Sequence, residues 1–328
     1  MKPIHSLYAL KAIGCLFVVM IHVPFMGRGP ASPIINAAVP LFLMISGYLL
    51  YEPRADANDL TLKLKHAIAK MVRIIIIVNA VYLLHALLRR AIAADTVFPI
   101  HSWTDVVEWI LFGHKFNSTL WYLNTYLWTL VILWVLCRCH AAKVIRYLPL
   151  LLVLTLLLGR YLFVLPIGGL TFDQRLNCFT IGLPFVSIGY IAHQKEAILH
   201  RITNKRLIYG IVLCIVLAYA ESLLLSTLGL NNHFGQFAFT IAYAILLFIG
   251  GVTHSNSHVH PIVENIGKYH SANIYYYHIL IANLFQSFGM HVPAIQAILV
   301  FVATWMLSIA LRRMPRISSG KTNAIQRH

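Results

Sequence analysis

Long apolar runs recur along nearly the whole chain, and they limit the folds that it can adopt. A transmembrane helix needs about 20 mostly apolar residues to cross the hydrocarbon core of a bilayer. Ten such runs lie at about 6–25, 34–51, 68–88, 119–138, 145–165, 177–193, 207–227, 234–252, 271–288 and 293–311. Because no large soluble insert separates these runs, the sequence predicts an all-α, polytopic membrane bundle of about ten transmembrane helices.

The composition agrees with this architecture. Of the 328 residues, 59% are hydrophobic and only 11% are charged, whereas a soluble domain carries about 25% charged residues. Ionic groups are scarce because an unpaired charge is costly in hydrocarbon. We therefore divide the chain into one transmembrane domain, residues 1–312, and a basic tail, residues 313–328.

One shorter apolar segment, Trp103 to Phe112, has too few residues to cross a bilayer as a helix. On a helix, its apolar side chains would share one face: Trp103, Val106, Val107, Ile110 and Leu111. Such an amphipathic helix lies along the membrane–water interface, and we predict that position for this segment.

The lysines and arginines are distributed unevenly among the loops. With a cytoplasmic N-terminus, 19 of the 26 lie on the inner side and 6 on the outer side, leaving Lys11 within the first span. Cytoplasmic loops carry an excess of these residues, and ten spans return the chain to its starting side. We therefore expect both termini in the cytoplasm. The same distribution explains the net charge of +16 without a nucleic-acid partner.

Two ionisable side chains lie inside the first apolar run, where charge is costly. Lys11 and His22 are separated by about three helical turns, so they fall on nearly one stripe, about 16 Å apart along the axis. In the expected orientation, Lys11 lies near the cytoplasmic face and His22 near the outer face. Alternatively, Lys11 extends to lipid headgroups and His22 is an interfacial histidine.

A second pair of cations, Lys70 and Arg73, opens the third span near its cytoplasmic end. Their spacing of three residues places them on one helix face. Either residue alone is explained by anchoring at the cytoplasmic membrane surface. Together with Lys11, however, they could form a cluster of three cations, which suits a polyanionic ligand because cations recognise phosphates by charge and hydrogen bonds.

Four further side chains are weaker candidates for ligand binding or for support of the site. Glu221 is an intramembrane carboxylate that could orient or balance the charge of His22, or could simply be solvated at the interface. Asp173 and Arg175 precede the sixth span and could bind a ligand or pair with each other. Trp121 could line a ligand site, although an aromatic belt at the interface is the favoured interpretation.

Four other histidines are not assigned to the candidate site. His278 lies inside the ninth apolar run, where we expect a hydrogen-bonded packing residue. His254, His258 and His260 lie in a short cytoplasmic loop without cysteine and with little acid, so we predict no metal site there.

The first span also carries a pattern that resembles a known family. Residues Lys11 to His22 are similar to the arginine, ten residues, histidine signature of the membrane acyltransferase-3 family, with Lys11 in place of the arginine. Further segments resemble motifs of this family in the same order, namely Val39–Tyr48, Lys70–Arg73, Leu120–Leu123, Gly182–Phe185 with Gly189–Tyr190, and Ile274–His278. The order of these motifs is more specific than any one of them.

This resemblance implies an integral O-acyltransferase of a bacterial inner membrane. It implies an acyl-CoA donor, with acetyl-CoA expected, that binds from the cytoplasm as a substrate; no cofactor is bound permanently. The acyl group would pass to a hydroxyl of an extracytoplasmic or lipid-linked saccharide. Lys11, Lys70 and Arg73 would hold the phosphates of the donor, and His22 would be the catalytic residue. Lysine stands where the family has the first arginine of two motifs, so the charge is kept but the bidentate fork is lost.

The chemistry of the reaction suits histidine at the predicted catalytic position. A sugar hydroxyl is a poor nucleophile at neutral pH, so its attack on a thioester requires removal of its proton. Histidine, with an ordinary pKa of about 6.5, can accept that proton. It could instead carry the acyl group covalently as an acyl-imidazole. Both routes are compatible with the sequence.

A second function is compatible with part of this pattern. A polysaccharide or lipid-linked saccharide exporter without acyl transfer would also need a polar stripe across the membrane. An exporter, however, has no need of a histidine aligned with a cationic cluster. We therefore expect an acyltransferase whose partners are acyl-CoA, a saccharide acceptor and membrane lipids, with no particular oligomeric state indicated.

Overall fold

The computed structural model describes residues 4–51, 57–92, 99–230, 235–255 and 258–313, and these residues form helices and no β-strand. The first α-helices are α1 (His5–His22), α2 (Arg28–Ile35), α3 (Ala38–Leu50), α4 (Ala57–Ile92), α5 (Trp103–Phe112), α6 (Trp121–Arg138), α7 (Leu152–Leu157) and α8 (Phe172–Arg175). They are followed by α9 (Leu183–Gln194), α10 (Glu196–Leu199), α11 (Asn204–Thr227), α12 (Ala238–Thr253), α13 (Pro261–Asn265), α14 (Ser271–Ser287) and α15 (Gln296–Arg313).

Within the described residues, seven helical segments are long and apolar enough to cross a membrane. They are His5–His22, Arg28–Leu50, Asp59–Ala91, Ser118–Arg138, Phe172–Gln194, Asn204–Thr227 and Gln296–Arg313. Each coincides with one of the ten predicted runs. The chain is therefore a multi-pass helical membrane protein, as the hydropathy pattern predicts.

The other three predicted runs do not form long continuous helices: one is broken into short pieces and two form shorter helices. The run at 145–165 is divided into a 3₁₀ segment (Ala142–Leu151), α7 and a short 3₁₀ turn (Leu162–Val164). Pro149 lies in the first of these pieces and cannot donate a backbone hydrogen bond, which disfavours a regular α-helix. The runs at 234–252 and 271–288 correspond to α12 and α14, with 16 and 17 residues.

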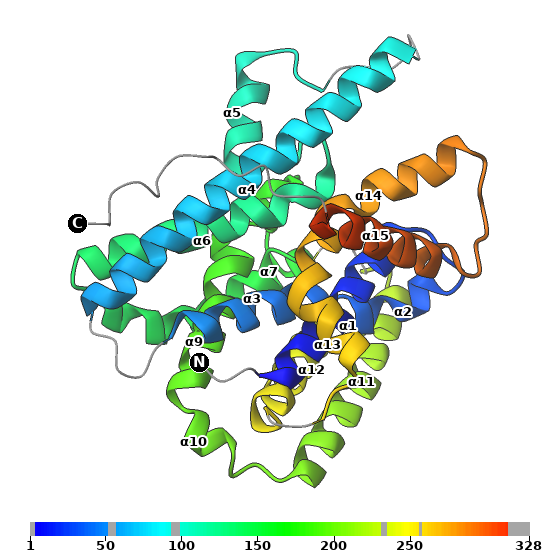
Figure 1. The fold of residues 1–328 in the computed structure, drawn as a ribbon. Coiled ribbons are helices and arrows are strands. Elements are labelled where there is room, and N and C mark those ends of the chain that lie inside the picture. Colours follow the sequence, from blue (N-terminus) through cyan, green and yellow to red (C-terminus); the bar gives the residue numbers. More distant parts are fainter. Residues whose placement is uncertain (1–3, 52–56, 93–98, 231–234, 256–257, 314–328) are drawn as a thin grey trace, which may run out of the picture.

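Helix α1 lies at the centre of the bundle and contacts α2, α3, α12, α14 and α15 (Figure 1). Its buried face carries small and aliphatic side chains, among them Leu7, Cys15, Val18 and Val19. Burial of this face against these helices and against α13 fixes the direction of α1, and therefore fixes where its two ionisable residues lie.

Helices α3 and α9 pack extensively against each other, and two glycines let them approach closely. A Cβ added to Gly47 would overlap the backbone of Val186, and one added to Gly189 would overlap the backbone of Met44. Small residues let membrane helices approach closely and gain van der Waals contact where the hydrophobic effect is absent.

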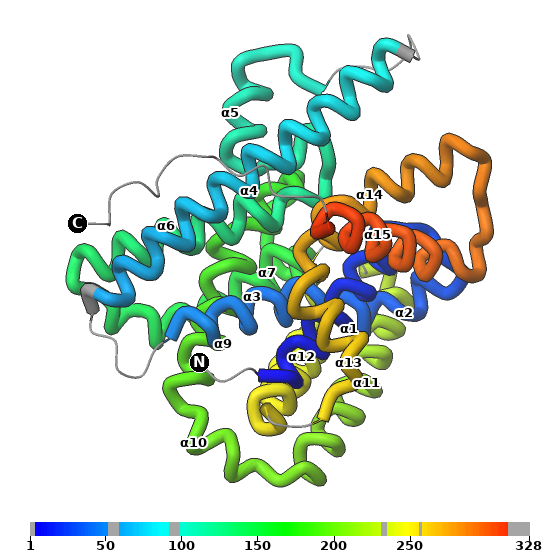
Figure 2. The backbone as a smooth tube through the Cα atoms, in the orientation of Figure 1, coloured from blue at the N-terminus to red at the C-terminus, as the bar shows by residue number. Residues whose placement is uncertain are grey.

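Much of the exposed surface of α4 and α11 is apolar. Only 17% of the spanning window of each helix is buried within the protein, and exposed side chains such as Ile76 and Leu223 suit contact with lipid tails. Helix α4 packs along α6, and its C-terminal turns extend beyond the body of the bundle (Figure 2).

Helix α5 has the bounds expected for the interfacial segment. Ser102 caps its N-terminus in a reciprocal capping box with Asp105, and Gly113 ends it in the left-handed conformation. Trp103, Val107 and Ile110 are exposed, as an interfacial helix requires. Of the basic tail expected in the cytoplasm, only Arg313 lies within the described residues.

Candidate active site

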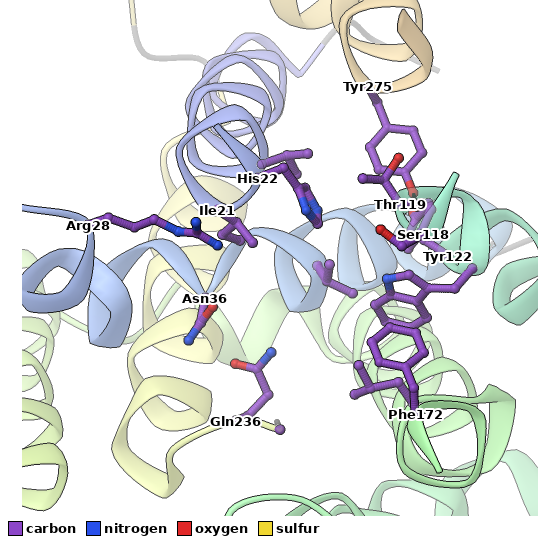
Figure 3. A pocket seen from close by; sticks show the side chains of 15 residues that line it. Ile21, His22, Arg28, Asn36, Ser118, Thr119, Tyr122, Phe172, Gln236 and Tyr275 are labelled. Atoms are coloured by element: carbon purple, nitrogen blue, oxygen red, sulfur yellow. Dashed lines mark hydrogen bonds between the residues drawn. The ribbon is translucent and has the colours of Figure 1, made fainter. Parts of the chain in front are cut away.

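A cavity of about 270 Å³ lies at the C-terminal end of α1, at the meeting point of segments that are far apart in the sequence (Figure 3). Its walls are made by Val18, Ile21, His22, Arg28, Asn36, Val39, Ser118, Thr119, Trp121, Tyr122, Phe172, Leu176, Gly235, Gln236 and Tyr275. These residues come from α1, α2 and the residue after it, α3, the 3₁₀ turn Ser118–Leu120, the start of α6, α8 and the residue after it, the segment before α12, and α14.

His22 is the last residue of α1, and its position follows from the local sequence. Val23 leaves the helical conformation for an extended one, as is usual for a residue that precedes proline, here Pro24. The imidazole therefore projects beyond the final turn into the cavity (Figure 3).

The structure places a second histidine beside His22. The ring centroids of His22 and His278 are 5.6 Å apart, although His278 lies outside the cavity lining. His278 is fully buried. Its Nδ1 lies 2.8 Å from the carbonyl oxygen of Tyr275 and 3.2 Å from that of Ile274. The sequence indicated a packing histidine in α14 but gave no sign that it would meet His22.

Aromatic side chains form much of the cavity wall. Trp121 and Phe172 meet edge to face at 5.9 Å, and Tyr122 packs on Tyr275 at 5.2 Å. Trp121 is only 8% exposed, so the structure places it in the cavity wall and not on the lipid-facing surface where an aromatic belt would lie. Flat aromatic faces of this kind suit the apolar faces of a sugar ring.

Hydrogen-bonding groups complete the cavity. Arg28, Asn36, Ser118 and Gln236 line it, and Gln236 points toward the open space (Figure 3). The buried Oε1 of Gln236 has no hydrogen-bond partner among the described residues. None of the described lining residues is a carboxylate, so the cavity offers neutral and cationic groups to a ligand.

The three predicted donor-binding cations lie away from this cavity. Lys11 is half-buried three turns earlier on α1, and its charge interacts with that of Lys70 on α4. Lys70 and Arg73 are exposed and share one face of α4. Within the described part of the chain, no carboxylate forms an ion pair with Lys11, Lys70 or Arg73. The structure thus brings Lys11 and Lys70 into electrostatic reach, with Arg73 one turn further along.

The predicted outer residues Asp173 and Arg175 belong to α8, next to the lining residue Phe172. Asp173 pairs with His114, with 3.1 Å between its Oδ1 and the Nδ1 of the imidazole. The backbone carbonyl of Arg175 accepts a hydrogen bond from the Thr180 hydroxyl at 2.8 Å. These contacts attach α8 to the neighbouring segments and hold Phe172 in the cavity wall.

Glu221 is buried and lies outside the cavity lining. Its carboxylate accepts hydrogen bonds from the backbone N–H groups of Ala238 and Phe239, at 2.8 and 3.0 Å, and from the Tyr161 hydroxyl. It therefore caps the N-terminus of α12 from a neighbouring helix, where negative charge is favoured. Because Gln236 lies just before this N-terminus, Glu221 supports one wall of the cavity.

Taken together, the helices form a multi-pass membrane bundle that holds a histidine in the wall of an aromatic-lined cavity. The model of the acyltransferase-3 family, described as an acyltransferase domain, matches residues 4–313, and the chain belongs to this family. It is therefore a membrane acyltransferase. No match was found among curated proteins or among solved structures.

Proposed function

We propose that this protein is an O-acyltransferase that moves an acyl group, acetyl in the first instance, from cytoplasmic acyl-CoA to a hydroxyl of an extracytoplasmic or lipid-linked saccharide. The observation that supports this most strongly is the placement of His22 in the cavity at one end of α1, with Lys11 on the same helix about 16 Å away. One helix thus carries a cation for the donor and an imidazole for the acceptor.

The proposed donor site is the cluster of Lys11, Lys70 and Arg73. Coenzyme A is a polyanion, and ammonium and guanidinium groups bind its phosphates through charge-assisted hydrogen bonds. The cluster lies toward the cytoplasm in the orientation that the loop charges favour. The pantetheine arm of the donor would then extend along α1 and bring the thioester to His22.

The proposed acceptor site is the cavity itself. Trp121, Phe172 and Tyr122 offer surfaces on which a sugar ring can stack, and the Gln236 and Asn36 amides offer hydrogen bonds to its hydroxyls.

His22 serves the reaction by one of two routes that the placement allows. As a general base, it takes the proton of the attacking hydroxyl, the ester C–O bond forms, the C–S bond breaks, and the CoA thiolate receives that proton. As a nucleophile, it takes the acyl group from the thioester and releases CoA, and the saccharide hydroxyl then attacks the acyl-imidazole. Both routes yield the same ester and free CoA.

The exporter that the sequence also allows is not proposed, because the family match is to an acyltransferase domain. Surface glycans from bacterial cells with and without this protein distinguish the two functions by mass spectrometry. Acyl transfer predicts that cells without the protein lose the mass of an acyl group from glycans that still reach the surface. Loss of the glycan itself, with no change in acylation, would contradict the proposal.

A further inference from the structure

The orientation of His278 fixes where its protons lie. Its Nδ1 faces two carbonyl oxygens of its own helix, those of Tyr275 and Ile274. A carbonyl can only accept a hydrogen bond, so Nδ1 carries the proton. In a neutral imidazole, Nε2 is then an acceptor. A doubly protonated ring would be a fully buried cation without a carboxylate beside it, which is costly.

The Nε2 atom of His278 is buried and has no hydrogen-bond partner among the described residues. Such an orphan acceptor costs free energy unless a group in the working enzyme satisfies it. The nearest phenol is already committed, since the Tyr275 hydroxyl donates to the backbone carbonyl of Thr119. The ring that lies closest to His278 with a nitrogen able to donate is that of His22, at 5.6 Å between centroids.

We propose that His278 is a positioning residue for His22. Its Nε2 accepts a hydrogen bond from one ring N–H of His22, directly or through one water, and so leaves the lone pair of the other nitrogen facing the cavity. This inference rests on the proposed function, because it assigns the tautomer that His22 needs as base or nucleophile.

The chemistry of catalytic histidines explains why such a partner is needed. The nitrogen that reacts must be unprotonated, and the hydrogen bond of the other nitrogen selects that tautomer. In many enzymes a carboxylate provides this bond. None of the described residues in the cavity lining is a carboxylate, and Glu221 is engaged at the N-terminus of α12. A neutral imidazole with a fixed acceptor nitrogen fills the role here.

Two substitutions separate this role from simple packing. In His278→Gln, the amide oxygen can occupy the place of Nε2 and accept a hydrogen bond. In His278→Asn, the amide reaches only the place of Nδ1. It can still donate a hydrogen bond to the helix carbonyls, but it leaves no acceptor atom facing His22. Transfer from acetyl-CoA is measured in proteoliposomes that contain the full chain, with acetyl-CoA binding measured separately.

We expect His278→Asn to lower kcat by about 100-fold, the lower end of the effect of a general base, with the KM for acetyl-CoA within about threefold of wild type. His278→Gln should retain activity within about tenfold of wild type. Equal losses in the two variants, or better activity in His278→Asn, would overturn the assignment. If His278→Asn does not insert, a loss above about tenfold in His278→Gln overturns it alone.

A buried histidine remote from the cavity provides the matched control. His270 bonds the Ser308 hydroxyl through Nδ1 at 2.8 Å and lies before the start of α14, so His270→Asn, which can keep that bond, should transfer acyl groups as wild type does. Failure of the proposed function gives results that differ from failure of the His278 assignment. In that case wild-type protein transfers no acyl group, or His22→Gln retains activity, whatever the two His278 variants do.

Discussion

At the scale of single residues, the ionisable groups within the bundle lie in different surroundings. His22 faces a cavity and His278 stands beside it, whereas Glu221 caps a helix. Lys11 and Lys70 lie within electrostatic reach on neighbouring helices. Charge is costly in a membrane; the Glu221 carboxylate is held at a helix end, and we propose that the cations are retained for a ligand.

The donor cations give a prediction at this scale. Alanine at Lys11, Lys70 or Arg73 removes one charge-assisted contact to phosphate, so we expect each variant to bind acetyl-CoA at least about tenfold more weakly. Lys70→Arg should bind as well as wild type or more tightly, because it keeps the charge and adds a bidentate fork.

Isothermal titration of purified protein in detergent with acetyl-CoA measures these affinities, and the melting temperature reports on the fold. Lys143→Ala, a substitution outside the proposed donor site, serves as the control. Unchanged affinity in all three alanine variants would remove the cluster from the donor site.

At the scale of elements, the tight crossing of α3 and α9 depends on Gly47 and Gly189. Gly47→Ala and Gly189→Ala each place a Cβ against the facing backbone, so we expect a loss of stability of about 1–3 kcal/mol, typical of overpacking. A Cβ added to Gly250 in α12 would meet no atom of a neighbouring helix within 4 Å. Gly250→Ala should therefore leave the melting temperature unchanged or raise it.

Thermal unfolding in one detergent, followed by the fluorescence of the tryptophans, compares these three variants. A melting temperature for Gly47→Ala and Gly189→Ala equal to that of Gly250→Ala would contradict the close crossing. Because neither glycine belongs to the proposed donor site, acetyl-CoA affinity below the melting temperature should change little.

The elements also show how far the sequence predicts the fold. The bounds of α5 follow from a local capping box and a terminal glycine, and the long spans follow from hydropathy alone. The run at 145–165 has the hydropathy of a span, yet Pro149 and the turn around Gly159 divide it. Hydropathy measures transfer into lipid and carries no information about such breaks.

The candidate site was predicted only in part. His22 and Lys11 share a helix, so their spacing reveals their common stripe. Trp121 and His278 come near His22 only because α6 and α14 pack around the end of α1. Long-range packing of this kind is set by side-chain fit between helices, which hydropathy and spacing do not encode.

At the scale of the whole molecule, the loop charges predict that both termini lie in the cytoplasm. A reporter that is active only in the cytoplasm should work when fused to the C-terminus. A reporter that is active only outside the cytoplasm should work when fused after Gly229. Both expectations follow because Lys and Arg are retained on the inner side. An external C-terminus, or a cytoplasmic position for the segment after Gly229, would contradict this orientation and the proposed path from donor to acceptor.

The central claim is that His22 performs acyl transfer in the cavity at the end of α1. The most direct test compares wild type and His22→Gln in proteoliposomes supplied with radiolabelled acetyl-CoA and a bacterial surface saccharide. Glutamine keeps the size and hydrogen bonding of histidine but takes up no proton at neutral pH. We predict normal insertion, normal acetyl-CoA binding and a loss of transfer of at least about 100-fold. Near-normal transfer by His22→Gln would contradict the account.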